Sequence, residues 1–178
     1  GVEQAGLAAR WFAGKDIGHL VASPLQRAQE TAAPIAARHG LVVASDARLV
    51  EATNVFEGLT FGVGDGSLRR PTHWKHLRNP IRPSWGEAYT ELAVRMLAGV
   101  TSAREHAAGH EAVVVSHQLP IEILRRFLTG RRLWHRPDRR TCALASITTL
   151  VYDGDELRGV EYTDHCAGMT AGKSVPGA

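Results

Sequence analysis

Cysteine is scarce in this sequence, and so are long apolar runs. The two cysteines, Cys142 and Cys166, lie apart along the chain and without metal-ligand spacing. Such usage argues against a disulfide scaffold and is typical of a reduced, cytoplasmic protein. No apolar run approaches the roughly 20 residues that a membrane helix requires, and no signal peptide is visible. We therefore expect a cytoplasmic globular protein that does not contact a membrane.

Neither sign of charge dominates, since 21 lysines and arginines face 18 aspartates and glutamates. The arginines nevertheless concentrate in two stretches, 69–82 and 125–140. Such runs are either solvated surface or a positive rim that attracts a phosphorylated ligand, and the sequence does not separate the two. A nucleic acid would suit the same charge, but only the arginine runs suggest it, so we expect no nucleic-acid partner.

Helix and strand patterns alternate along the chain. Strands are expected at 19–23, 41–44, 112–116, 145–152 and 157–162, and helices at 2–12, 28–38, 87–103 and 120–128. The uniformly apolar 112–116 is expected to be a central strand covered on both faces. This order predicts an α/β three-layer sandwich, with a mostly parallel central sheet and helices on both faces. We expect a single domain over 1–166, lacking a first strand, and a flexible tail over 167–178.

Ligands of open α/β sheets bind beyond the carboxyl ends of the strands, and this rule selects Arg27, Glu51 and His117. An arginine at a strand-to-helix turn can bind a phosphate through its planar fork, assisted by the N–H groups of the helix N-terminus. Taken singly, each residue can also be interpreted without a function. Arg27 would then be a surface arginine, Glu51 a solvated loop carboxylate and His117 a structural histidine.

Three motifs tie these residues together. Ser23-Pro24-Leu25-Gln26-Arg27-Ala28-Gln29-Glu30-Thr31-Ala32 resembles the S-S-P-L-x-R-A-x-x-T-A segment of the histidine phosphatase superfamily, with Ala22 in place of the first serine. Residues 49–51 resemble its L-x-E segment, and 113–118 resemble its V-S-H-G segment, with Gln118 in place of the glycine. The motifs follow one another in the family's order over most of the chain. The sequence is therefore similar to the phosphoglycerate mutase-like proteins.

The resemblance implies a role for each matched residue. Arg27 is implied to be a phosphate ligand and Ser23 to shape the loop around it. The expected phosphate-binding residues are Arg27, Ser23 and Gln118. His117 would bind the phosphoryl group, and Glu51 would protonate the leaving oxygen and then activate water. A general acid must be protonated near the working pH, and burial beside a phosphate would raise the pKa of a glutamate accordingly. This scheme requires no cofactor and no metal.

The family's nucleophile is a histidine in an Arg-His-Gly motif at the end of the first strand. Arg38-His39-Gly40 has those letters, but it follows a predicted helix and lies after Arg27, so we interpret it as a basic helix end with a glycine cap. Residues 1–5 resemble the segment that follows the nucleophile strand. We therefore expect the strand and its Arg-His-Gly upstream of Gly1.

The stretch 70–85 mixes rings and cations and is the expected substrate lid. The candidate lid residues are His73, Trp74, His76, Arg82 and Trp85. A packed insertion is the alternative. His73 and His76 have the His-x-x-His spacing of a zinc site, but no cysteine or carboxylate partner stands nearby, so we expect no metal.

The predicted function is hydrolysis of a small organic phosphomonoester through a phosphohistidine intermediate. A phosphoglycerate mutase shares the chemistry, although the stretch after Glu51 looks short for one. A non-catalytic member that binds an anion or a protein is the third alternative. The expected partner is a small phosphorylated substrate, and whether the chain forms a homodimer is left open.

Overall fold

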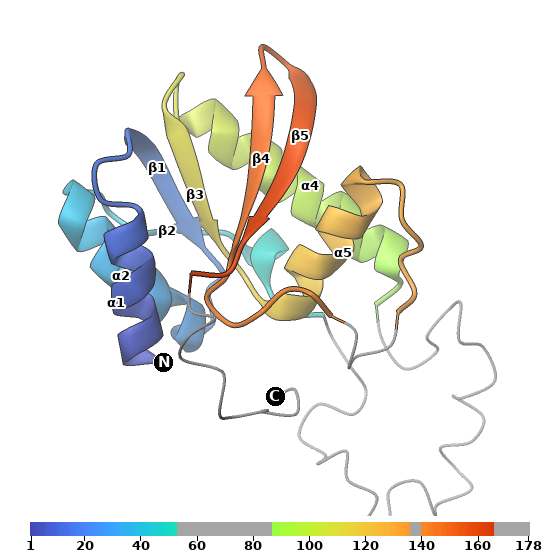
Figure 1. Ribbon diagram of the computed structural model, residues 1–178, viewed down its shortest axis with the longest axis horizontal. Coiled ribbons are helices and arrows are strands. Elements are labelled where there is room, and N and C mark those ends of the chain that lie inside the picture. Colours follow the sequence, from blue (N-terminus) through green and yellow to red (C-terminus); the bar gives the residue numbers. More distant parts are fainter. Residues whose placement is uncertain (53–86, 136–139, 166–178) are drawn as a thin grey trace, which may run out of the picture.

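A computed structural model describes residues 1–52, 87–135 and 140–165. The elements are α1 (Val2–Trp11), β1 (Ile17–Ala22), α2 (Gln26–His39), β2 (Ala44–Ser45), the 3-10 helix η1 (Ala47–Leu49), α4 (Tyr89–His106), β3 (Glu111–Val115), α5 (Gln118–Leu128), β4 (Ile147–Asp153) and β5 (Glu156–Thr163) (Figure 1). This order follows the predicted alternation. The expected lid residues and the tail over 167–178 lie outside the described residues.

The central sheet is parallel, as predicted. Its strand order is β2-β1-β3, and in the register Leu20 lies opposite Val113. β4 and β5 form a separate antiparallel hairpin. The strand expected at 41–44 is shorter than predicted, because only β2 pairs with the end of β1, whereas Val42 is 88% exposed.

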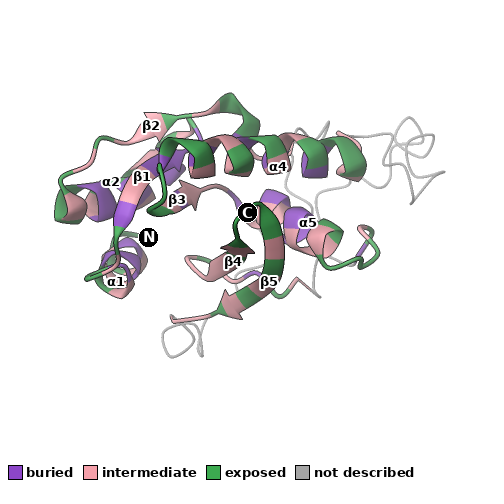
Figure 2. Ribbon diagram, turned by 90° about the horizontal axis from the view of Figure 1, so that it is seen from above, coloured by how far each residue is buried: buried purple, intermediate pink, exposed green. Residues whose placement is uncertain are grey.

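Helices cover both faces of this sheet, which confirms the α/β sandwich. Because side chains alternate along a strand, Leu20 and Ala22 pack toward α1 and α2, whereas Val21 packs toward α4 and α5. Two hydrophobic clusters result, one on each face. Figure 2 shows the buried residues on the sides of the helices that face the sheet.

The position of β3 differs from the expectation of a central strand. Within the described part of the chain, β3 pairs only with β1 and therefore forms the edge of the parallel sheet. Its apolar residues Ala112, Val114 and Val115 are only half-buried. A cavity of about 2220 Å³ lies between β3 and β4 and is also lined by residues of α1, α4 and α5. The most apolar strand of the chain thus has one edge on a cavity rather than against another strand.

Candidate active site

The structure brings Arg27 and His117 together at the carboxyl end of the parallel sheet. Arg27 lies in the first turn of α2, directly after β1, and His117 lies between β3 and α5. The Nε–H of Arg27 donates to Nδ1 of His117 across 3.0 Å, and Oγ of Ser23 lies 2.8 Å from Nε2 of the same ring. Arg27 and His117, ninety positions apart in the sequence, thereby form one polar cluster with Ser23. The cluster lies beyond the carboxyl ends of the strands, where ligands of α/β sheets bind.

The hydrogen bonds of His117 define its protonation state. A guanidinium can only donate, so Nδ1 accepts from Arg27, and Nε2 carries the hydrogen and donates to Ser23. Burial lowers the pKa of His117 to about 4, and the positive charges of Arg27 and Arg95 act in the same direction. His117 is therefore a neutral imidazole at neutral pH.

Ser23 is fully buried and fixes the loop between β1 and α2. Its backbone N–H donates to the carbonyl of Val115 at 2.9 Å, and its own carbonyl accepts from the side chain of Gln29 at 2.8 Å. Its hydroxyl also accepts from the backbone N–H of Leu25, at 3.4 Å. These bonds hold the loop that presents Arg27 against the loop that presents His117.

Glu51 follows η1 and lines the same cavity as Arg27 and His117. Its carboxylate accepts from the backbone N–H of Ala52 at 3.0 Å. Burial raises the pKa of Glu51, and the hydrogen bond and the charges of Arg27, Arg140 and Arg95 only partly offset this effect. A carboxyl group with a raised pKa beside an arginine–histidine pair has the properties that proton donation to a leaving oxygen requires.

Gln118 begins α5, and its side-chain amide donates to the carbonyl of Cys142. The residue thereby joins the start of α5 to the loop that precedes β4. Its binding of a phosphate remains a prediction.

Two arginines near the site, Arg95 and Arg140, were not singled out from the sequence. Their charges act on the pKa of Glu51. Arg95 stands alone on an amphipathic helix, and Arg140 was noted only as a member of the arginine run over 125–140, so no motif marked either residue individually. Only the folded arrangement brings their charges near enough to Glu51 to lower its pKa.

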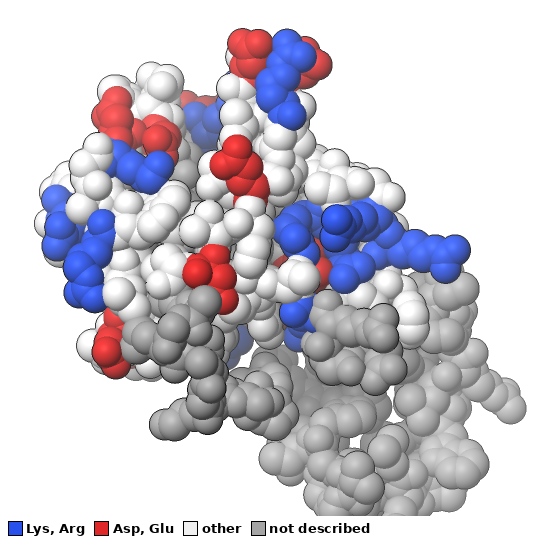
Figure 3. All heavy atoms as spheres, in the orientation of Figure 1, with Lys and Arg blue, Asp and Glu red and all other residues white. Residues whose placement is uncertain are grey.

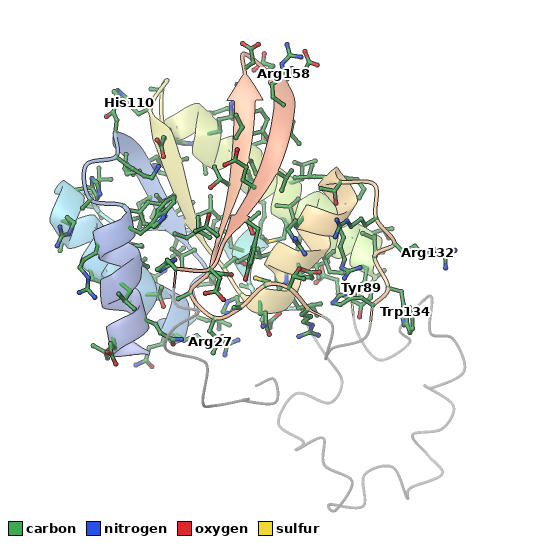
Figure 4. All side chains as sticks on the ribbon, viewed as in Figure 1. Arg27, Tyr89, His110, Arg132, Trp134 and Arg158 are labelled. Atoms are coloured by element: carbon green, nitrogen blue, oxygen red, sulfur yellow. The ribbon has the colours of Figure 1, made fainter. Side chains whose placement is uncertain are left out.

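Part of the second arginine run is structural. Arg125 and Arg126 bind the carboxylate of Glu122, which is 0% exposed, at 2.9 and 2.6 Å. Arg131 and Arg132 are exposed, and Arg132 lies on the right of Figure 4, where Figure 3 shows a positive region. Figure 4 shows Arg132 far from Arg27, so this region does not form the immediate rim of the site.

Arg38-His39-Gly40 ends α2, as predicted. Gly40 adopts the left-handed conformation of a helix C-cap with φ of 66°. Nε2 of His39 lies 3.1 Å from the carbonyl oxygen of Phe12. Because Arg27 and His39 lie at opposite ends of one helix, about 18 Å of helix axis separates them.

No group of three or more histidine, cysteine, aspartate or glutamate residues within 1–52, 87–135 and 140–165 has an arrangement that could hold a metal ion. None of the helices in these ranges is long and apolar enough to cross a membrane.

An arginine–histidine pair at the carboxyl edge of a parallel α/β sheet has the position and the donors that binding of a phosphate group requires. The family model of the histidine phosphatase superfamily (branch 1) matches residues 1–165, and the chain belongs to this family.

The chain is also similar to several individual proteins. Rv0525 of Mycobacterium tuberculosis is 57% identical over 94% of this chain and 83% of its own length. A protein of Yersinia pestis named "Probable phosphoglycerate mutase GpmB" is 32% identical over 99% of this chain and 82% of its own. The solved structure of mycobacterial glucosyl-3-phosphoglycerate phosphatase Rv2419c with inorganic phosphate matches with a TM-score of 0.55 and 27% identity, over 72% of this chain and 66% of that one.

Proposed function

We propose that this protein is a phosphatase that hydrolyses a small organic phosphomonoester through a phosphohistidine intermediate. The observation that carries the proposal is the Arg27–His117 pair with Glu51 beside it, at the carboxyl edge of a parallel sheet. The names of the mutase and phosphatase relatives support the same chemistry. The cysteine usage supports a cytoplasmic site of action.

Arg27 and His117 would hold the phosphoryl group. The guanidinium fork matches two phosphate oxygens, and the N-terminus of α2 adds backbone N–H groups and a positive dipole end. Stabilising the charge of the equatorial oxygens is most of the catalytic task in phosphoryl transfer. A phosphate at Arg27 would withdraw that donor from Nδ1 of His117, which would allow the ring to take up a proton and donate to the anion.

We further propose that the nucleophile is a histidine upstream of Gly1, on a strand that lies in the cavity between β3 and β4. Both strands direct an edge toward this cavity, and the apolar residues of β3 are only half-buried beside it. A strand inserted there would pair with each edge at the usual spacing of about 4.8 Å and join the two sheets into one. If it ran parallel to β3, its carboxyl end would lie beside His117 and Arg27.

The proposed reaction has two steps. A ring nitrogen of the upstream histidine attacks phosphorus, the phosphorus–oxygen ester bond breaks, and Glu51 gives its proton to the departing alkoxide. Water then attacks the phosphohistidine while the Glu51 carboxylate removes a proton from it. The phosphorus–nitrogen bond breaks, inorganic phosphate leaves, and both the histidine and the protonated Glu51 are regenerated.

The test is phosphate release by the full-length chain from a panel of phosphomonoesters, run beside an assay for isomerisation of phosphoglycerate. We expect phosphate release without isomerisation, and we expect Arg27→Met to lower kcat/KM about 100-fold or more. Arg27→Lys should retain part of the activity, and the control His39→Ala should retain most of it. Isomerisation would identify a mutase, and wild-type chain that binds phosphate without turnover would identify a non-catalytic binding protein.

A further inference from the structure

The segment that leads to Glu51 is fixed more tightly than its irregular sequence suggests. The Asp46 carboxylate accepts from the backbone N–H of Arg48 at 2.8 Å and from the Arg48 side chain at 2.7 to 3.0 Å. Leu49 is completely buried against α4. A Cβ atom added at Gly99 of α4 would lie 2.9 Å from the Leu49 side chain, so the segment and the helix are in close contact.

Arg95 connects this segment to two others. On α4, its Nε and Nη2 donate to the two carboxylate oxygens of Glu87 at 2.6 and 2.7 Å, a bidentate pair. Its remaining nitrogen, Nη1, donates to the backbone carbonyl of Arg48 at 2.5 Å. Each of the three guanidinium nitrogens therefore donates one hydrogen bond to a protein acceptor, and one of these bonds ends three residues before Glu51.

The next carbonyl of the same segment is held from the other side. The hydroxyl of Ser116, the residue before His117, donates to the carbonyl of Leu49 at 2.7 Å. The carbonyls of Arg48 and Leu49 are thus fixed by α4 and by the end of β3, respectively. Two adjacent peptide groups held by two different elements leave Glu51 little freedom relative to His117.

We propose that Arg95 is a positioning residue that fixes the Glu51 carboxyl group relative to the Arg27–His117 pair. The proposal rests on the proposed function, because it assigns Glu51 the role of proton donor. The charge of Arg95 acts in addition to its hydrogen bonds, since it opposes the rise in the pKa of Glu51 and lowers the pKa of His117. Arg95 itself need not touch the substrate.

The leaving group distinguishes positioning of a proton donor from general damage to the fold. An alkyl phosphate needs a proton on its departing oxygen, whereas the phenolate of p-nitrophenyl phosphate leaves without one. The comparison uses kcat/KM, which reports only the step in which the leaving group departs, because the later hydrolysis of the phosphohistidine is the same for both substrates. In the full-length chain, we expect Arg95→Met to lower kcat/KM for an alkyl phosphate about 10- to 100-fold, but kcat/KM for p-nitrophenyl phosphate by less than about threefold. Arg95→Lys should recover part of the loss.

Three comparisons make the test specific. Glu51→Gln should show the same leaving-group dependence as Arg95→Met. The double variant that combines Arg95→Met with Glu51→Gln should have an activity only slightly below that of Glu51→Gln alone, because both changes act through the Glu51 carboxyl group. Arg104→Met, on the same helix, removes an arginine that contacts Asp155 and should affect both substrates equally. The alkaline limb of the alkyl-phosphate profile should move to higher pH in Arg95→Met, because the charge that lowers the pKa of Glu51 is gone.

The outcomes separate the two proposals. Equal losses for both substrates in Arg95→Met, with the leaving-group dependence intact in Glu51→Gln, would refute the positioning role and leave the phosphatase proposal standing. If the wild-type chain released no phosphate from either substrate, the proposed function would fail and the positioning role with it.

Discussion

The pKa of His117 makes the stability of this protein depend on pH, and the size of the effect follows from the structure. The side chain is 6% exposed, and burial followed by the charges of Arg27 and Arg95 lowers its pKa from 6.5 to about 4. Below pH 6.5 the unfolded chain binds a proton at this ring, whereas the folded chain does so only near pH 4. The folded state therefore loses stability as the pH falls from 6.5 to 4, and the loss at pH 4 is about 3 kcal/mol.

His117→Gln isolates this contribution. The glutamine amide can accept from Arg27 and donate to Ser23, but it does not titrate. Urea denaturation of the full-length wild type and variant at pH 7 and pH 4 gives four free energies of unfolding. We expect the wild type to lose about 3 kcal/mol more than the variant between the two pH values. Equal losses in the two proteins, within about 0.5 kcal/mol, would show that His117 is not the buried neutral imidazole described above.

Two further predictions concern the phosphate-binding pair and the α5 ion pairs. When the protein binds inorganic phosphate at pH 6, it should take up a proton beyond those that the phosphate itself exchanges, because the phosphate withdraws Arg27 from His117 and the ring can then be protonated. Calorimetry in buffers of different ionisation enthalpy measures this uptake. The variant His117→Gln should lack it. Glu122→Ala should lower the free energy of unfolding by about 3 kcal/mol or more, because it leaves Arg125 and Arg126 half-buried without their carboxylate. Urea denaturation measures the change, and a loss under about 1 kcal/mol would contradict this prediction.

The parts of the site that were predictable are those coded by local pattern. Arg27 and His117 stand directly after apolar strands, and the rule that ligands bind at carboxyl strand ends places them together whatever the details of packing. The helix end at Gly40 was equally accessible, because a glycine after a basic last turn is a local signal.

The parts that were not predictable depend on long-range contacts. Arg95 reaches the carbonyl of Arg48 across 47 residues, and no spacing in the sequence signals a bond from a side chain to a distant backbone group. The same holds for Ser116 and Leu49. The free edge of β3 within the described residues was also not predicted, because an apolar strand indicates burial but not which neighbour supplies it.

The central proposal is that Arg27, Glu51 and His117 serve a histidine nucleophile located upstream of Gly1. The most direct test is to quench the full-length chain during turnover of a phosphorus-labelled substrate and to map the labelled residue by peptide mass spectrometry under alkaline conditions, which preserve phosphohistidine. We predict an acid-labile label on one histidine that precedes Gly1, and no label when that histidine is replaced. A label on His39 or His117, or turnover that survives loss of every upstream histidine, would contradict the proposal.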